Sequence, residues 1–471
     1  MKKWVISLLA VLIISSSAFC AEDEERPLAN HEKDGLNARS LDQVFRLSPD
    51  EIDLGIAALI ISEQWSDKVG GLKYLDDLDE IAYEIRRRCQ QRRIPMNSDA
   101  IKIINDYLYE ELGYGSVKEA TNPEDLFLHN VMDNKKGYCL SLSMLYLAIG
   151  ERLGLPLYGV VVPGHFFVRY QDMSITFNIE TTSKGGTADD EHYIKEFKVP
   201  ESGTLYMKSL NKLQTIGCFL NNLGTCYMEV EQHKKASETL EKSIEITPML
   251  AESRTNLGNV YLKLGNSDKA IREYKAAIDI NPNSGKAHGN LGNAFLQKNW
   301  PDDAIKEYKK ALDLEPQSLE SHKGLANAYI EKNMYSMAMQ TIRNAIKLSP
   351  NDADLYYLLG NTYGKFKDCD NAVRHYKTAL QMNPKLTNAY IGLGICYNIY
   401  NQPDEAINAF KAAVDIDSRN YAALANLGGT YFNQKKYSEA IRYYSKASKL
   451  NNGDYDVHYN LGASYFNSKN Y

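Results

Sequence analysis

A cysteine and a histidine that stand 26 residues apart have the types and the setting that bond-making chemistry requires. Cys139 opens an apolar run that is expected to form a helix to Leu153, and His165 opens a run that is expected to form a strand to Gln171. Unpaired N–H groups at a helix N-terminus favour a thiolate, and a neighbouring imidazole can take and return a proton. The pair therefore predicts nucleophilic catalysis, with Cys139 as the nucleophile and His165 as the general base.

The elements around this pair supply candidates for a third polar group, which would orient the imidazole. Short β-type runs cover 157–162, 165–171 and 175–179, so the expected order is helix with cysteine, strand, strand with histidine, strand. The last strand brings Asn178 and Glu180 to its end. An amide or a carboxylate oxygen can accept a hydrogen bond from the ring, so the spacing leaves both residues open.

The region before the cysteine has the apolar spacing of packed helices. One helix is expected to start at Pro49-Asp50-Glu51 and to run through Ile61. Another apolar stripe runs from Ile101 to Leu112 and ends at Gly113. Between these two lies a stripe with helical spacing, made of Leu75, Leu78, Ile81, Ile85 and Cys89.

The second half of the chain repeats every 34 residues. The dipeptide Leu-Gly recurs with this period, and Leu325-Ala326 fills the one gap in the series. Aromatic, alanine and proline positions keep the same register, so each unit is expected to form two antiparallel helices that stack into an all-α solenoid. The leucines of the dipeptide are Leu223, Leu257, Leu291, Leu359, Leu393, Leu427 and Leu461.

This pattern resembles tetratricopeptide repeats, with seven full units over 217–454 and a partial eighth that reaches Tyr471. The resemblance implies a concave groove, lined by the first helix of each unit, that binds a protein or an extended peptide. The position two residues after the repeat leucine faces such a groove. Asparagine amides at this position can pair with a peptide backbone, although the repeat pattern can also favour asparagine without any ligand. Four successive units place asparagine there: Asn259, Asn293, Asn327 and Asn361.

The first region resembles the transglutaminase-like superfamily, and in particular its compact bacterial branch. The resemblance implies a papain-like fold and action on amide or peptide bonds. It implies Cys139 as the nucleophile, His165 as the general base and Glu180 as the third catalytic member, with Asn178 as the alternative. The likeness covers about 45–205 and rests on segments in a fixed order: Asn122-Pro123, Val131-Met132, Gly137-Tyr138-Cys139, Gly154-Leu155-Pro156, Pro163-Gly164-His165-Phe166 and the strand that ends at Glu180.

These interpretations predict the fold class and the order of the domains. An α+β transglutaminase-like domain, made of a helical bundle and a small antiparallel sheet, is expected over 40–205. A linker helix over 206–216 would join this domain to the all-α tetratricopeptide solenoid over 217–471.

The N-terminal segment and the last repeat each lead to a separate prediction. Lys2-Lys3, an apolar run and a small polar exit make 1–20 an expected signal peptide for export to the periplasm or the cell exterior, with cleavage after Ala18 or Cys20. If it is not cleaved, this segment would be an N-terminal membrane anchor. Residues 21–39 are expected to form a flexible leader. The eighth repeat has only its first helix, so either that helix caps the stack or the chain is a fragment, and we expect a fragment.

Composition, charge and histidine spacing argue against a nucleic-acid surface and against a metal or cofactor site. A net charge of −6 with 24% charged residues argues against a nucleic-acid surface. His129, His165 and His192 are scattered and have no paired cysteine, so no metal and no cofactor are expected.

The predicted function is an exported cysteine peptidase, amidase or acyl-transfer enzyme that is coupled to a protein-binding array. The alternative is a non-catalytic interaction scaffold, in which the first domain is a degenerate form of its fold. The reactivity of Cys139 separates the two hypotheses, because only a catalytic pair makes this thiol reactive.

Overall fold

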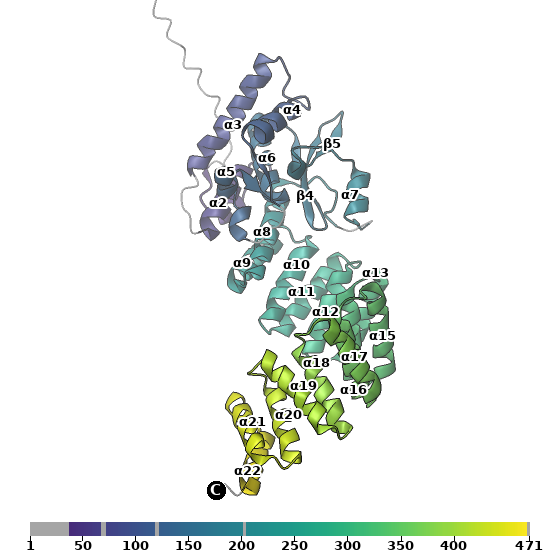
Figure 1. Cartoon of the computed structure of the whole chain (residues 1–471). Coiled ribbons are helices and arrows are strands. Elements are labelled where there is room, and N and C mark those ends of the chain that lie inside the picture. The colour runs from purple at the N-terminus through teal and green to yellow at the C-terminus, as the bar shows by residue number, and fades with distance from the viewer. Residues whose placement is uncertain (1–36, 67–71, 118–121, 201–203, 469–471) are drawn as a thin grey trace, which may run out of the picture. The chain divides into compact units, whose positions relative to one another are not determined.

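The computed structural model of the chain describes residues 37–66, 72–117, 122–200 and 204–468. The expected signal peptide (1–20) and the expected leader as far as residue 36 lie outside these ranges. The chain divides into two compact units between Leu257 and Gly258 (Figure 1). Among the helices of the described ranges, none has the length together with the low polarity of a membrane-spanning segment.

The first unit is built around one buried helix. Every residue of α6 (Cys139–Leu153) from Leu140 to Gly150 is buried. A helix that is apolar on all sides belongs in a core, which explains the nearly unbroken apolar run after Cys139. The helix packs against α2 (Leu54–Trp65), α3 (Leu72–Gln91), α5 (Leu128–Asn134), β3 (Leu157–Val162) and β4 (His165–Gln171). The described residues of the unit also include α1 (Leu41–Val44), α4 (Ala100–Asn105), a π-helical turn (Asp106–Glu111), 3-10 turns at Pro123–Leu126 and Thr181–Ser183, and α7 (Asp190–Glu196).

The helix expected to start at Pro49 starts later, so that prediction is wrong. Glu51 accepts hydrogen bonds from the N–H and the hydroxyl of Ser48, which closes a turn instead of a helix. The side chain of Asp53 then caps α2 by accepting from the Ile56 N–H at 2.8 Å. Capping by Asp53 therefore sets the start of the helix at Leu54.

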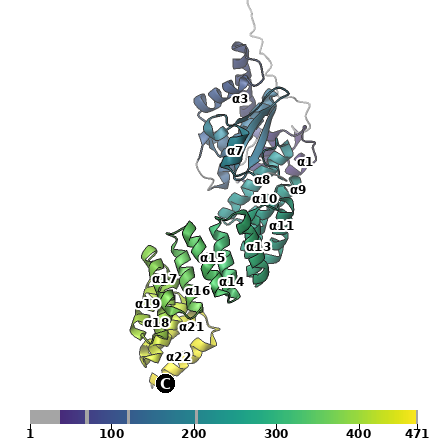
Figure 2. The same cartoon turned by 90° about the vertical axis from the view of Figure 1, so that its right-hand side faces the viewer.

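The three predicted strands form an antiparallel sheet in the order β3-β4-β5, where β5 is Thr176–Ile179. Val162 pairs with His165 across a tight turn, in which Gly164 has a φ of +74° that favours glycine. Helix α7 lies against this sheet (Figure 2), and its Tyr193 shares a buried cluster with Phe167. A parallel pair of two-residue strands, β1 (Gly115–Ser116) and β2 (Lys136–Gly137), was not predicted, because strands of this length are too short to show alternation.

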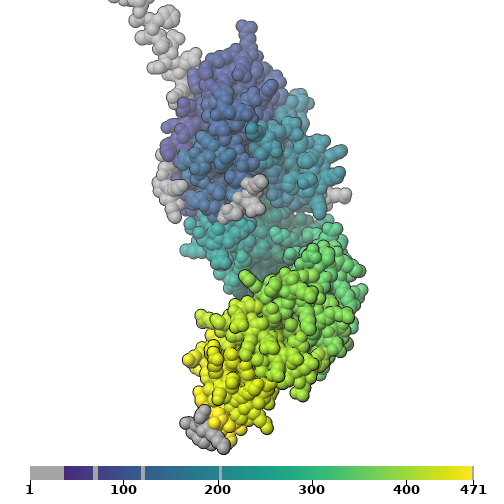
Figure 3. Space-filling model, viewed as in Figure 1, coloured from purple at the N-terminus to yellow at the C-terminus, as the bar shows by residue number. Residues whose placement is uncertain are grey.

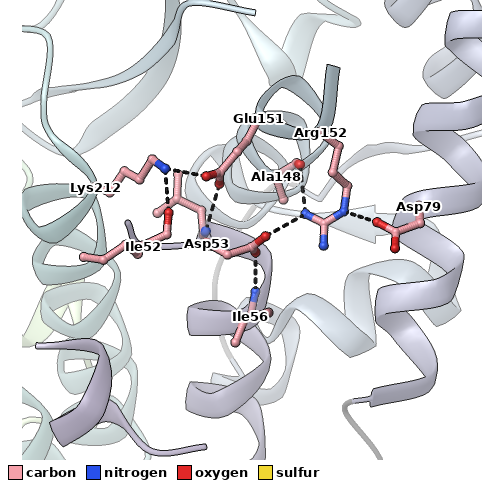
Figure 4. Close-up of polar contacts among 9 residues, drawn as sticks. Ile52, Asp53, Ile56, Asp79, Ala148, Glu151, Arg152 and Lys212 are labelled. Carbon is pink, nitrogen blue, oxygen red and sulfur yellow. Dashed lines mark hydrogen bonds and ion pairs between the residues drawn. The ribbon is translucent and has the colours of Figure 1, made fainter. Parts of the chain in front are cut away.

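A buried ionic network holds the C-terminal turn of α6 (Figure 4). The Arg152 side chain donates to Asp79 at 2.6 Å and lies 3.6 Å from the Asp53 carboxylate. Asp53 and Arg152 are both buried. Burial raises the pKa of Asp53, and the positive charge of Arg152 opposes that rise. The network therefore joins α6 to α2 and α3. Removing either Asp53 or Arg152 would leave the other charge buried without its partner, which is destabilising.

Glu151 extends this network to α8 (Lys212–Glu229). Its carboxylate accepts from the Leu54 N–H at 3.0 Å and forms an ion pair with Lys212 (Figure 4). Lys212 also donates to the Ile52 carbonyl at 2.5 Å. The start of α8 is thus tied to the end of the helix that begins at Cys139.

Replacing Arg152 by methionine is expected to destabilise the first unit by about 3–5 kcal/mol, because Asp53 would stay buried without its cation. Urea unfolding followed by Trp65 fluorescence, in a background that carries Trp4→Phe and Trp300→Phe, measures the effect. The matched control is Arg87→Met, whose exposed pair with Glu84 contributes at most about 1 kcal/mol. Equal shifts of the unfolding midpoint in the two variants would contradict the role given to Arg152.

The first repeat belongs to the first unit. It consists of α8 and α9 (His233–Ile246), and the first residues of α10 (Ala251–Lys263) follow it. Helix α8 contacts α2, β3 and the 3-10 turn Pro123–Leu126. The Tyr227 hydroxyl donates to the Trp65 carbonyl at 3.0 Å. These contacts fix the first repeat helix on α2, β3 and the turn that precedes α5.

The linker helix predicted over 206–216 is not a separate helix. Leu210 forms a β-bridge with Gly159, so this part of the segment is extended. Asn211 then caps α8 by accepting from the Gln214 N–H at 2.9 Å. The helix begins at Lys212 and continues without a break as the first helix of the repeats.

The second unit is all-α, as the 34-residue period predicts, and its repeats follow one another in sequence order (Figure 3). Tyr308 shows why glycine recurs: a Cβ at Gly292 would lie 2.9 Å from its ring, and a Cβ at Gly324 of the next repeat 2.4 Å from it. After α10 the helices are α11 (Ser267–Ile280), α12 (Gly285–Gln297), α13 (Pro301–Leu314), α14 (Leu319–Glu331), α15 (Tyr335–Leu348), α16 (Ala353–Lys365), α17 (Cys369–Met382), α18 (Thr387–Ile399), α19 (Pro403–Ile416), α20 (Tyr421–Asn433), α21 (Tyr437–Leu450) and α22 (Tyr455–Ser468).

Candidate active site

Cys139 is the first residue of α6, as predicted. The helix starts there because Tyr138 is extended and its N–H donates to Ser141 Oγ at 2.8 Å. A Cβ at Gly137 would lie 2.7 Å from the same Oγ, so this turn needs glycine. As the first helical residue, Cys139 has an N–H group without an intrahelical partner. Among the cysteines of the described residues, Cys139 is the one that is not fully buried.

His165 is the first residue of β4 and connects Cys139 to Glu180. Its Nε2 lies 2.7 Å from Glu180 Oε2, and the ring is also hydrogen-bonded to the side chain of Cys139. Burial would lower the pKa of His165, but the hydrogen bonds to Cys139 and Glu180 outweigh burial and raise the pKa to about 10. Burial would raise the pKa of Glu180, but the bonds to His165 and Thr182 outweigh it and lower this pKa. The ring therefore carries a proton at neutral pH.

Three residues that the sequence analysis did not assign hold His165 and Glu180 in place. The ring of Phe197 stacks on the His165 ring at 4.9 Å between centroids and 4° between planes. The Tyr193 hydroxyl donates to Glu180 Oε2 at 3.2 Å, and the Thr182 N–H donates to Oε1 at 3.0 Å. Aromatic residues four positions apart at the end of α7 were the available sequence signal, but they do not indicate what they pack against.

The structure places Asn178 away from the imidazole. Its Oδ1 accepts from Arg169 at 2.8 Å, and its Nδ2 donates to Asp190 at 2.7 Å and to the Ala188 carbonyl at 3.1 Å. The partner of the His165 ring is therefore Glu180, and the alternative choice of Asn178 is wrong. Strand β5 ends at Ile179, and Glu180 caps the 3-10 turn that follows, so the alternation of side chains along the strand does not extend to Glu180.

Cys139 and His165 open onto a cavity of about 450 Å³. Part of its wall comes from α8, which the sequence analysis did not assign to the site. A smaller cavity of about 90 Å³ shares Cys139, His165 and Asn222 with the larger one. The α8 residues that line the larger cavity are Asn222, Thr225, Cys226 and Glu229.

No cluster of three or more histidine, cysteine, aspartate or glutamate side chains in the described ranges has the arrangement of a metal site. His165 is instead hydrogen-bonded both to Glu180 and to Cys139. The arrangement supplies a thiol, a proton carrier and a carboxylate that orients it, which is the set that nucleophilic attack on a carbonyl requires.

The four predicted groove asparagines stand at equivalent positions of α10, α12, α14 and α16. Asn259 accepts from the Tyr274 hydroxyl at 2.8 Å, and Asn293 accepts from Tyr308 at 2.6 Å. Asn293 and Asn327 are exposed, whereas Asn259 and Asn361 are half-buried. The carbonyl oxygens of Asn259 and Asn293 thus support their own repeats, which their sequence position did not show.

Comparisons with protein families agree with both regions. A model of the transglutaminase-like superfamily matches residues 72–213. Models of the tetratricopeptide repeat match 219–248, 258–299, 295–362, 357–420, 399–445 and 428–468. The chain therefore contains a transglutaminase-like domain followed by tetratricopeptide repeats, and these repeats form a protein-interaction array.

Individual relatives match parts of the chain. A UPF0162 protein of Xylella fastidiosa (strain Temecula1 / ATCC 700964) is 29% identical over 161 residues, which are 32% of this chain and 57% of the relative. F-box only protein 21 of Mus musculus is 23% identical over 150 residues, which are 27% of this chain and 24% of the relative. The chain thus spans about half of the first relative and about a quarter of the second.

Solved structures match parts of the chain. MamA is 29% identical, and the match covers 35% of this chain and 95% of MamA with a TM-score of 0.32. YrrB, described as a TPR protein with an unusual peptide-binding site, is 26% identical, and the match covers 40% of this chain and 96% of YrrB with a TM-score of 0.32.

Proposed function

We propose that this protein is an exported cysteine hydrolase or acyl transferase, which acts on amide or peptide bonds of a protein partner held by its repeats. The observation that carries the proposal is the His165 ring, which is hydrogen-bonded to Cys139 on one side and to Glu180 on the other. The alternative of a non-catalytic scaffold gives this arrangement no function.

In the acylation step, Cys139 attacks the amide carbonyl carbon as the thiolate, and a C–S bond forms. The unpaired N–H of Cys139 at the start of α6 is placed to donate to the developing oxyanion. Protonated His165 gives its proton to the leaving nitrogen as the C–N bond breaks. The product is an acyl-enzyme with a neutral imidazole.

In the second step, water or an amine attacks the thioester carbonyl. Neutral His165 accepts a proton from this nucleophile, and the C–S bond breaks to regenerate the thiolate. Glu180 keeps the ring in place throughout and stabilises its positive charge. Water as the acceptor gives hydrolysis, and an amine gives transfer.

Product analysis tests this proposal. The purified protein is incubated with glutamine-containing peptides and a fluorescent primary amine. Amine incorporated into the peptide would identify transfer, ammonia alone would identify glutamine hydrolysis, and a cleaved backbone would identify a peptidase. The absence of all three products, together with a Cys139 that does not react with iodoacetamide, would contradict the proposal and favour the scaffold.

The proposal includes export and a partner in the repeat groove. Residues 1–20 support export by their order of charge, apolar run and small residues. N-terminal sequencing of the exported protein is expected to start at Phe19 or Ala21, and an intact Met1 in a membrane fraction would indicate an uncleaved anchor instead. The partner is proposed to contact the four groove asparagines, Asn259, Asn293, Asn327 and Asn361.

A further inference from the structure

One face of α8 lines both cavities at the candidate active site. Cys218 and Asn222 line the smaller cavity, and Asn222, Thr225 and Glu229 line the larger one. These four residues are three or four positions apart, so they share one face of the helix. Helix α8 is the first helix of the first repeat, yet this face meets the same cavities as Cys139.

The repeat register shows which face this is. Thr225 stands two residues after Leu223, the position that carries asparagine in four later repeats. Its hydroxyl donates to the Asn221 carbonyl at 3.0 Å and accepts from Asn256 Nδ2 at 3.0 Å. Asn256 also donates to Asn221 Oδ1 at 3.0 Å, which links α8 to α10. The groove face of the first repeat therefore lines the cavity at Cys139, and hydrogen bonds to α10 hold this face in place.

The wall brings negative charge to this cavity. Glu229 is exposed at the end of α8 and lines the larger cavity. Within the described part of the chain, no lysine or arginine lines either cavity. The positive charge of His165 is already balanced by Glu180 at 2.7 Å. A bound group next to Cys139 would therefore gain from carrying a positive charge.

We propose that the groove face of the first repeat selects the substrate, and that Glu229 favours a protein segment with lysine or arginine next to the reacting amide. This inference rests on the proposed function, since it names the substrate class of the same site. An extended segment fits because the amide of Asn222 can donate to and accept from a peptide backbone. A volume of about 450 Å³ lies within the usual range for a cleft that binds a ligand.

Two charged thiol reagents of similar size test the selection at Cys139. One methanethiosulfonate carries a trimethylammonium group and the other carries a sulfonate. In the unaltered protein, the cationic reagent is expected to modify Cys139 faster. In Glu229→Gln, which keeps the shape of the side chain, the ratio of the cationic to the anionic rate constant is expected to fall about fivefold. Mass spectrometry of the peptide that contains Cys139 measures both rates.

The matched control is Glu245→Gln. Glu245 is exposed on α9 of the same unit and lines neither cavity, so its replacement is expected to leave the ratio unchanged. An equal change of the ratio in both variants, or no change in either, would overturn the role of Glu229. A Cys139 that reacts with neither reagent would instead overturn the proposed function, so the two failures are distinguishable.

Protection by peptides tests the occupant itself. Two extended peptides that differ only by lysine or glutamate beside a central glutamine compete with neutral iodoacetamide for Cys139. The lysine peptide is expected to protect at a concentration about fivefold lower, and Glu229→Gln is expected to remove this difference. Equal protection by both peptides in the unaltered protein would overturn the inference.

Discussion

Replacing Cys139 by alanine is expected to abolish amide hydrolysis and transfer, a loss of at least about 10⁴-fold in kcat, because no C–S bond can form. Labelling by iodoacetamide near neutral pH is expected to disappear with it. The helix should survive the change, since alanine is a better helix former than cysteine and the start of α6 depends on Tyr138 and Ser141. Product formation and the mass of the labelled protein provide the measurement.

The matched control for this prediction is Cys89→Ala. Cys89 is buried in α3 of the same unit and contacts neither cavity, so activity and labelling are expected to persist. Cys226 is the other thiol on the larger cavity, and burial raises its pKa to about 12, which keeps it in the unreactive thiol form. Labelling that moved to Cys226 or stayed unchanged in Cys139→Ala would contradict the role of Cys139.

Replacing His165 by alanine is expected to lower kcat by about 10²–10⁴-fold, the usual contribution of a positioned proton carrier. It should also slow the alkylation of Cys139 at neutral pH, since the sulfur loses the positively charged ring beside it. Steady-state kinetics and the rate of carbamidomethylation measure the two effects. His192→Ala is the control, because His192 is exposed on α7 and lines neither cavity. Equal rates in both variants would contradict the role of His165.

The pH dependence follows from the same ring. The pKa of His165 is about 10, so the proton that acylation needs is present at neutral pH and lost as the pH rises through about 10. The alkaline limb of the pH–rate profile is therefore expected near pH 10, and Glu180→Gln should move it to lower pH. Because the pKa lies above its ordinary value of 6.5, protonated His165 contributes stability that is complete below about pH 6.5 and lost through about pH 10. An alkaline limb that stays in place in Glu180→Gln would contradict this coupling.

Much of the fold was predictable because the sequence patterns that define its elements lie within single helices, strands or repeats. The apolar run after Cys139 and the tight turn at Gly164 mark the ends of α6, β3 and β4, which the structure places at the predicted residues. The 34-residue period predicted the second unit in the same way, since each repeat is packed against its neighbours. The start of α2 was missed because Pro49 resembles a helix start, whereas the capping bond of Asp53 decides it.

The candidate site was predicted in part. Cys139, His165 and Glu180 meet as expected, because each lies at the start or end of an element and those ends converge. Asn178 shares the strand with Glu180, but Arg169 and Asp190 hold it elsewhere. The alternation of side chains along the strand could not show which of these two residues contacts the His165 ring, since that depends on partners from other segments.

The sequence by itself determined the repeat register, the order of the two regions and the positions of Cys139 and His165 at the starts of their elements, because spacing along the chain records helices, strands and repeats. Only the tertiary structure decided which residues surround that pair. Phe197, at the end of α7, stacks on His165, and the side of α8 that carries Glu229 lines the cavity. Both contacts join segments that are more than 30 residues apart and whose local patterns are those of ordinary packed helices. These contacts result from the packing of helices on the sheet and on α6. Packing between distant segments produces no repeating pattern in the sequence, so the sequence could not predict it.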